Sequence, residues 1–321
     1  MYQLDDLDRG LLHALHVNGR APFSHIAEAL DVSTQTVARR YRRLRALASL
    51  RVIGLTDPQR TGESLWLARF SATPQAAQDI ANSLARRSDT SWVKLASGGT
   101  EIVAVVRENN HSLLLHDTPR TTSITAVSAH YILHTYLGGP TAWSGHTTAL
   151  SEDQQRLLRP PAVAGGSDQP LMAEDASLLA ALGRDGRTSH ADLATVTKRS
   201  PSTVARRLAD LQASGAVFFD VEIDPACLGA RAEALLWMSV MPARLDEVAG
   251  TLARHAELAF VAATTGRTNL VALALCPTPA ALHDYLIHRL GTLVAINGME
   301  TAPVLRVIKS AGPLSPLAPA G

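Results

Sequence analysis

The sequence predicts an α+β fold in which one unit occurs twice in tandem. Three observations predict it: an internal repeat, a three-helix pattern at the start of each copy, and an alternation of strand and helix patterns after it. The composition, 46% hydrophobic and 18% charged over 321 residues, is typical of a globular protein of more than one domain.

The repeat is found by aligning Asp8 with Asp175 and continuing without a gap. Over residues 8–44 and 175–211, 15 of the 37 aligned positions are identical, and five of these form the run Thr-Val-Ala-Arg-Arg. After one inserted residue the alignment still matches Gly98 with Gly266. Chance does not produce this agreement, so the two halves are copies of one unit.

Composition divides the chain into six predicted segments. A stretch rich in Gly, Pro and Ser separates the copies, with a short helix expected from Glu152 to Leu158. The expected segments are a winged helix-turn-helix at 1–56, a βαββαβ domain at 57–138, a linker at 139–171, the same two domains again at 172–223 and 224–311, and a disordered tail at 312–321.

Three helices are predicted at the start of each copy. In the first copy, an apolar stripe runs from Leu7 to Leu15, and Gly19 is expected to end that helix. Ser24 and Ser33 are expected to cap the second and third helices, and Pro201 occupies the first helical position of the third helix in the second copy. Three short helices in this order are typical of a helix-turn-helix motif, whose third helix enters the major groove of DNA.

The third helix carries the candidate DNA-binding residues. From Val32 to Thr56 there are six arginines and no acidic residue, although the net charge of the chain is only +1. A charge run is usually just a solvated helix face, but its place on the third helix in both copies favours DNA, because arginine makes paired hydrogen bonds to guanine and phosphate. The candidates expected on the outward face are Ser33, Thr34, Gln35, Thr36, Arg39, Arg40, Arg43, Ser200, Ser202, Thr203, Arg206 and Arg207.

Strand and helix patterns alternate after each three-helix unit. The first copy predicts strands at 65–71, 91–96, 101–107 and 124–136, with helices at 74–87 and 110–116. The second predicts strands at 234–241, 258–264, 269–275 and 300–308, with helices at 245–255 and 279–290. This order is the ferredoxin-like βαββαβ arrangement, whose helices leave one face of the sheet bare.

The chain resembles the Lrp/AsnC, or feast/famine, transcriptional regulators. The resemblance is carried by Ser200 to Leu208 with Ser214 to Val217, and by Leu182 to Arg187 with Asp192 to Ala194. It implies a RAM/ACT-like second domain that binds small effectors, often amino acids, and mediates dimerisation. The family's effector loop lies between the second and third strands, with a Gly-x-x-Asp-like pattern from which both copies depart by lacking the aspartate. The corresponding candidates are Gly98, Gly99, Thr100, Glu101, Gly266, Arg267, Thr268 and Asn269, and a plain β-turn is the alternative interpretation of the glycines.

The resemblance implies a sequence-specific DNA-binding transcriptional regulator whose operator binding is modulated by a small molecule, without enzymatic activity, cofactor or metal. Ordinary members pair their sheets between two chains, so we expect the two βαββαβ domains here to pair within the chain. Because the two recognition helices differ, the expected partner is double-stranded DNA with an imperfect palindromic operator. Other expected partners are an effector such as an amino acid and further copies of the chain in a homo-oligomer.

The sequence also bears on location. It contains no run of 18 apolar residues and begins without a signal-peptide pattern, which predicts a cytoplasmic protein without membrane contact. Cys227 and Cys276 are too few for the usual zinc site and are expected to be buried thiols.

Two other functions remain open. Siroheme decarboxylases resemble the same regulators in fold, and they can occur as two fused halves. Their activity is associated with histidines near the second and third strands, but residues 92–106 and 260–275 contain none. His130 and His134 would lie about 13 Å apart on a strand, too far to share one ion, and His283 and His288 do not share a helix face well. A sensor that has lost DNA binding is the third alternative.

Overall fold

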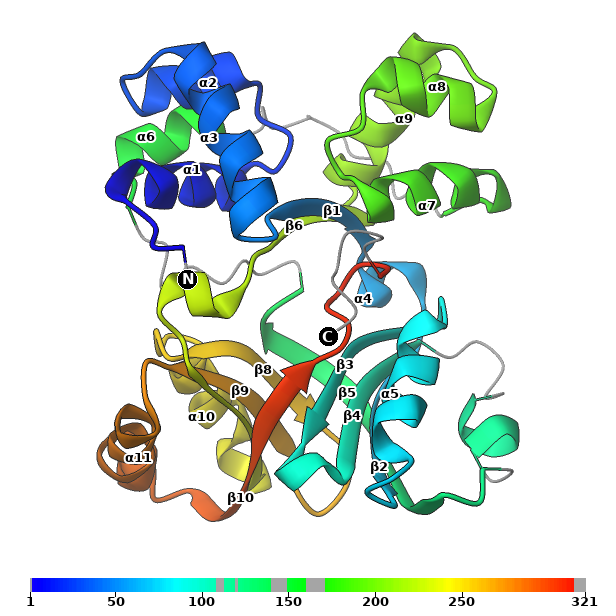
Figure 1. The fold of residues 1–321 in the computed structure, drawn as a ribbon, viewed down its shortest axis with the longest axis vertical. Coiled ribbons are helices and arrows are strands. Elements are labelled where there is room, and N and C mark those ends of the chain that lie inside the picture. The colour runs from blue at the N-terminus through cyan, green and yellow to red at the C-terminus, as the bar shows by residue number, and fades with distance from the viewer. Residues whose placement is uncertain (1, 108–112, 119–120, 140–148, 160–170, 315–321) are drawn as a thin grey trace. The chain divides into compact units, whose positions relative to one another are not determined.

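The computed structural model describes residues 2–107, 113–118, 121–139, 149–159 and 171–314 (Figure 1). Its contacts divide the chain into two compact units, and each unit contains material from both copies of the repeat. Unit 1 comprises residues 1–62 and 146–228, and unit 2 comprises residues 63–145 and 229–321. Much of the predicted linker and most of the predicted tail fall on 140–148, 160–170 and 315–321, which lie outside the described residues.

Unit 1 holds both of the predicted helix-turn-helix motifs. The first consists of α1 (Asp6–Val17), α2 (Phe23–Ala29) and α3 (Thr34–Leu47). The second consists of α7 (Ala176–Arg184), α8 (His190–Thr197) and α9 (Pro201–Ala213), preceded by the 3-10 turn η4 (Ala173–Asp175). The short elements α4 (Pro58–Thr61) and η5 (Pro225–Leu228) follow the wings.

The predicted caps are partly confirmed. Ser33 Oγ accepts a hydrogen bond from the Thr36 amide at 3.1 Å, Ser200 caps α9 in the same way, and Pro201 is the first residue of α9. The prediction that Ser24 caps α2 is wrong, because the helix already begins at Phe23 and leaves Ser24 inside its first turn.

The prediction that Gly19 ends α1 is also wrong. Asn18 is the C-cap, and Gly19 is not among the glycines with a left-handed backbone. A Cβ at Gly19 would lie 2.8 Å from Phe219 Cβ and 2.9 Å from Val52 Cγ1. The glycine is therefore needed where strands from both copies approach the end of the helix.

The wings of the two copies pair with each other. β1 (Arg51–Thr56) and β6 (Val217–Glu222) form an antiparallel two-stranded ribbon over their whole lengths. Beside it, Arg187 donates to the backbone oxygens of Gly19 at 2.7 Å and Ala21 at 2.9 Å. Arg20 reciprocates by donating to the oxygens of Gly186 and Thr188. The Gly-Arg pair that recurs in the repeat thus joins the two motifs.

The predicted helix at 152–158 is confirmed as α6 (Glu152–Leu158), which packs against α1 and α2. Leu158 is buried there, and its backbone oxygen accepts a hydrogen bond from Asn18 Nδ2 at 3.0 Å. The side-chain amide of Gln154 donates to the oxygen of Ala29 at 2.7 Å. α6 therefore extends the apolar core of the first motif.

Unit 2 holds both βαββαβ domains. The first copy supplies β2 (Leu65–Ala72), α5 (Ala77–Arg86), β3 (Thr90–Ala96), the turn η1 (Ser97–Gly99), β4 (Glu101–Arg107), the π-helical turn η2 (Leu113–Asp117) and β5 (Ile124–Leu137). The second supplies β7 (Ala232–Val240), η6 (Pro242–Arg244), α10 (Leu245–Leu252), β8 (Leu258–Thr264), β9 (Leu270–Cys276), α11 (Pro279–His288), η7 (Leu290–Thr292) and β10 (Ile296–Val307).

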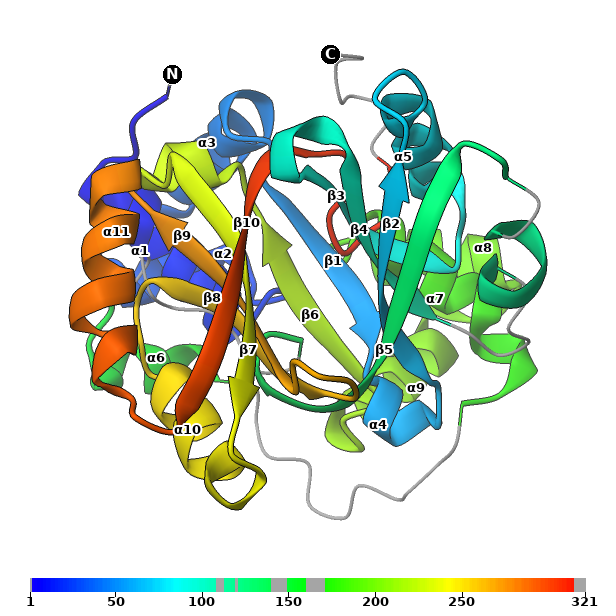
Figure 2. The same cartoon turned by 90° about the horizontal axis from the view of Figure 1, so that it is seen from below.

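The two sheets pair within the chain, as predicted, and close into a barrel. The strand order is β10-β3-β4-β2-β5-β8-β9-β7, so β3–β10 and β5–β8 are the seams between the copies (Figure 2). The faces that the helices leave bare meet inside the barrel, where Val103 and Leu67 of the first copy pack with Trp237 and Val271 of the second. Because these faces are buried against each other, one chain can form the sheet pairing that would otherwise need two chains.

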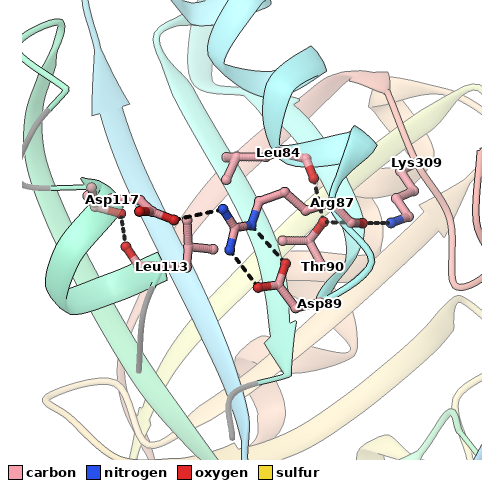
Figure 3. A network of polar contacts seen from close by, with 8 residues as sticks. Leu84, Arg87, Asp89, Thr90, Leu113, Asp117 and Lys309 are labelled. Atoms are coloured by element: carbon pink, nitrogen blue, oxygen red, sulfur yellow. Dashed lines mark hydrogen bonds and ion pairs between the residues drawn. The ribbon is translucent and has the colours of Figure 1, made fainter. Parts of the chain in front are cut away.

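The second helix of the first βαββαβ domain is described only in part. The sequence predicts a helix at 110–116; the structure has η2 from Leu113, and 108–112 lie outside the described residues. A polar network holds η2 in place: Arg87 donates to both carboxylate oxygens of Asp89 and to Asp117 at 2.7–2.8 Å, while Lys309 donates to the Arg87 oxygen (Figure 3). Hydrogen bonding to Asp89 raises the pKa of Arg87.

Candidate nucleic-acid interface and effector loops

The outward face of α3 presents arginine, as predicted. Val37, Tyr41 and Leu44 are buried on the opposite side, which directs Arg39 and Arg43 to solvent. Arg39 forms no ion pair with a described residue, and Arg43 lies 4.7 Å from the ring centre of Tyr2. The candidates at the start of this helix are exposed at Ser33, Thr34 and Gln35 and half-buried at Thr36.

Arg40 does not belong to that face. Its Nη1 lies 2.5 Å from an oxygen of Asp5 and 3.3 Å from an oxygen of Asp8, and 20% of its side chain is exposed. Asp8 is fully buried and also accepts a hydrogen bond from Tyr2. The hydrogen bond to Asp5 raises the pKa of Arg40. The arginine therefore ties α3 to the start of α1, and the expectation that it faces outward for DNA is corrected.

The second copy repeats this arrangement. Arg207 Nε and Nη2 donate to the two oxygens of Asp175 at 3.1 and 2.6 Å, and both residues are buried. Burial opposes the ionisation of Asp175, but hydrogen bonds from Arg207 and from the Met172 amide outweigh it, so the net shift lowers the pKa of Asp175. The prediction that Arg207 lies on the outward face is wrong, because this guanidinium compensates the aspartate inside the motif.

We call the ion pairs Arg40–Asp8 and Arg207–Asp175 the two struts. A signal for them exists in the sequence, because the partners are 32 residues apart in both copies and all four are identities of the repeat. The two arginines of each Thr-Val-Ala-Arg-Arg run are both identities of the repeat, so the run alone does not show which of them is buried.

The outward face of α9 is less charged. Arg206 is exposed and forms no ion pair with a described residue. Ser202 is exposed, Thr203 is half-buried, and Ser200 Oγ lies 2.9 and 2.8 Å from the hydroxyl oxygens of these two residues. The structure thus brings the predicted polar candidates together at the start of α9.

The candidate effector loop of the first copy is a tight turn. Gly98 and Gly99 have φ angles of 75° and 87°, in the region that favours glycine. Glu101 is buried, and its carboxylate accepts hydrogen bonds from Arg69 Nε and Ser97 Oγ, each at 2.7 Å. Glu101 is therefore engaged inside the protein, and Thr100 is the exposed candidate side chain of this loop.

The corresponding loop of the second copy is packed against β5. Gly266 has a φ of 109°, and a Cβ there would lie 2.5 Å from His130 Nδ1. Asn269 exchanges hydrogen bonds with the backbone of Val240 at 2.8 and 2.9 Å, and the Thr268 oxygen accepts one from Thr264. Arg267 is exposed and makes no hydrogen bond or ion pair with the part of the chain that the structure describes.

The histidines and cysteines that the structure describes do not gather into a metal site. His130 Nδ1 lies 2.8 Å from the Thr265 oxygen, and the rings of His134 and Tyr136 are 4.6 Å apart. Among the described residues, no group of three or more His, Cys, Asp or Glu side chains could hold a metal ion. Cys227 and Cys276 are buried free thiols, and burial raises the pKa of both. No helix in the described ranges has the length and hydropathy to cross a bilayer.

Models of protein families match both helix-turn-helix motifs and one βαββαβ domain. The AsnC-type helix-turn-helix domain matches residues 4–45 and 174–212, and the Lrp/AsnC ligand binding domain matches residues 233–314. Together the matched ranges cover about half of the chain. The chain belongs to the Lrp/AsnC family. This assignment agrees with the resemblance carried by the recognition helices.

Curated relatives correspond to a single copy of this Lrp/AsnC chain. The HTH-type transcriptional regulator FL11 of Pyrococcus horikoshii is 28% identical over 141 residues, which cover 44% of this chain and 93% of the relative. The HTH-type transcriptional regulator Ptr1 of Methanocaldococcus jannaschii is 27% identical over 136 residues, which cover 42% and 92%.

A solved structure matches nearly the whole chain. The crystal structure of the siroheme decarboxylase NirDL superimposes with a TM-score of 0.63 over 96% of this chain and 93% of that chain, at 13% sequence identity. At that identity the likeness shows the fold alone. It shows that the arrangement of two Lrp/AsnC-like copies in one chain is shared.

Proposed function

We propose that this Lrp/AsnC chain is a sequence-specific, DNA-binding transcriptional regulator that places two recognition helices on one operator. The observation that supports this most is the pair of α3 and α9, with exposed Arg39 and Arg206 at equivalent positions of one unit. The ribbon β1–β6 and the reciprocal hydrogen bonds of Arg20 and Arg187 join the two motifs. One chain thus supplies the two recognition helices that ordinary members of the family would supply by pairing two chains.

Footprinting on DNA fragments selected from the source genome tests this proposal. We expect protection of two segments whose centres are about 34 Å apart along the duplex, or a multiple of that, because each recognition helix occupies one major groove. Arg39→Ala is expected to weaken binding by about 1–3 kcal/mol if the guanidinium contacts a base. Arg156→Ala is the control, because it removes an exposed charge of unit 1 that is paired with Asp153 on the same helix, α6. No enrichment of any fragment would contradict the proposal.

The fold shared with NirDL makes decarboxylation of siroheme the second candidate function. Against it, no histidine occurs in 92–106 or 260–275, the stretches around the second and third strands of each copy. We therefore propose that the chain is not an enzyme. Incubation of the protein with siroheme, followed by mass spectrometry, should recover the substrate unchanged; loss of carboxyl groups would establish the enzymatic alternative.

We further propose that an effector binds at the loop of the second βαββαβ domain, the copy that the ligand-binding model matches. The exposed guanidinium of Arg267 suits a carboxylate, as amino acids carry, because its donors form a fork of matching geometry.

A thermal-shift screen with free amino acids tests this site. A ligand at 100 times its Kd is expected to stabilise the protein by about 2.7 kcal/mol. Arg267→Ala should abolish the shift, and Thr100→Ala, which changes the exposed side chain of the first loop, should leave it unchanged. The opposite pattern would move the effector site to the first copy.

A further inference from the structure

The two recognition helices differ in charge although they share one alignment. Each position of α3 corresponds to a position of α9 that lies 167 residues later. Arg39 and Arg206 correspond, as do the strut residues Arg40 and Arg207. The remaining arginines of α3 have uncharged or acidic counterparts: Arg42, Arg43 and Arg45 align with Ala209, Asp210 and Gln212.

The charges of α3 are available to an anion. Arg42 and Arg43 are exposed and form no ion pair with a described residue. Arg45 lies 3.6 Å from Asp185, but both side chains are well exposed, so water already screens this pair. With Arg39, four guanidinium groups on one helix can contact phosphates.

The charges near α9 are largely compensated. Asp210 lines the same groove of the second motif as Arg206 and Arg207. Arg199, just before the helix, is paired with Glu174 at 2.6 Å. Lys198, which is exposed in a left-handed conformation, and Arg206 are the cations of this face without a carboxylate partner among the described residues.

The second motif nevertheless keeps the form of a recognition unit. Its strut holds α9 on the start of the motif, and the hydroxyls of Ser200, Ser202 and Thr203 cluster at the helix start. Residues at the start of a recognition helix contact base edges, and Ser and Thr hydroxyls can bond to bases of either kind. The second motif has fewer unpaired cations than α3 to attract phosphates, but it keeps the surface that faces bases.

We propose that the two motifs divide the work: the first supplies most of the phosphate-driven affinity, and the second adds base contacts at a weakly held half-site. This inference rests on the proposed function. The ribbon β1–β6 and the Arg20 and Arg187 hydrogen bonds keep the second motif near DNA once the first is bound. Weak contacts then suffice, because the second binding step is intramolecular.

Salt titrations with a random-sequence DNA duplex, which isolates the phosphate contribution, test the division. Log affinity falls against log salt, and each lost phosphate contact makes this negative slope shallower by about 0.9. The triple variant Arg42→Ala/Arg43→Ala/Arg45→Ala is expected to make the slope shallower by about 2.7, and Arg206→Ala by about 0.9. The reciprocal variant Ala209→Arg/Asp210→Arg copies two arginines of α3 into α9 and should make the slope steeper by about 1.8.

These outcomes separate the inference from the function on which it rests. Equal slopes for the wild type and the triple variant, or no steeper slope with the added arginines, overturn the division of work. A wild-type protein that binds no duplex at any salt concentration contradicts DNA binding itself. Circular dichroism melting curves check that each variant is folded. The altered side chains on α3 are all exposed, so their replacement should leave the fold intact.

Discussion

Arg207→Ala is expected to destabilise the protein by about 3–5 kcal/mol, because it leaves a buried carboxylate without its cation. Asp175 is 1% exposed and accepts hydrogen bonds from Nε and Nη2 of the guanidinium. Urea unfolding followed by circular dichroism measures the loss. Arg206→Ala is the matched control: it removes the neighbouring arginine, which is exposed and unpaired among the described residues, and should change stability by about 0.5 kcal/mol or less.

The pH dependence gives this prediction a second readout. Because the net pKa of Asp175 is lowered in the folded state, the ionised pair stabilises the fold above the unfolded-state value of about 3.9, and this contribution is lost as pH falls through the folded value. The difference between the wild type and Arg207→Ala should therefore be full at neutral pH and shrink in acid. A difference that grows as pH falls would contradict the strut.

The second large effect is expected at the seam of the barrel. Lys94 of β3 and Glu233 of β7 form an ion pair between the two copies, and their side chains are only 5% and 15% exposed. Lys94→Met should cost about 3–5 kcal/mol, since the glutamate loses its partner in a poorly hydrated place. The double variant Lys94→Met/Glu233→Met should recover most of that loss, because neither charge of this pair then remains.

Urea unfolding followed by tryptophan fluorescence measures this cycle. All the tryptophans lie in the ranges of unit 2, so the signal reports that unit. A single variant as stable as the wild type, or a double variant no better than the single, would show that the pair is not buried as the structure has it.

Much of the fold could be predicted because the same sequence patterns occur at equivalent positions of the two copies. The apolar stripe of the first helix, the caps Ser33 and Ser200 and the alternation of strands each have a local cause that recurs at the same offset. The pairing of the two sheets followed from the bare face of each domain.

What escaped prediction depends on contacts between distant segments. The pairing of β1 with β6 and the reciprocal hydrogen bonds of Arg20 and Arg187 join residues that are far apart in sequence. No local sequence pattern therefore predicts them. Gly19 is the residue type that commonly ends a helix, but here it allows the side chain of Phe219 to lie close to the backbone.

The sequence predicted which helices carry exposed arginines, but it did not predict correctly which arginine of each pair is exposed. Adjacent residues of a helix point about 100° apart, so Arg40 can turn toward the core of the motif while Arg39 beside it stays exposed. Arg39 and Arg206 are exposed, whereas Arg40 and Arg207 turn toward the aspartates at the start of each motif.

The salt dependence of duplex binding by the intact chain tests the central claim most directly. Six exposed cations lie on the two recognition helices or, in the case of Lys198, shortly before the second: Arg39, Arg42, Arg43, Arg45, Lys198 and Arg206. If all of them contact phosphates, log affinity should fall against log salt with a slope of about −5. A slope near zero, with retention of the duplex unchanged by salt, would contradict an operator held by these two helices.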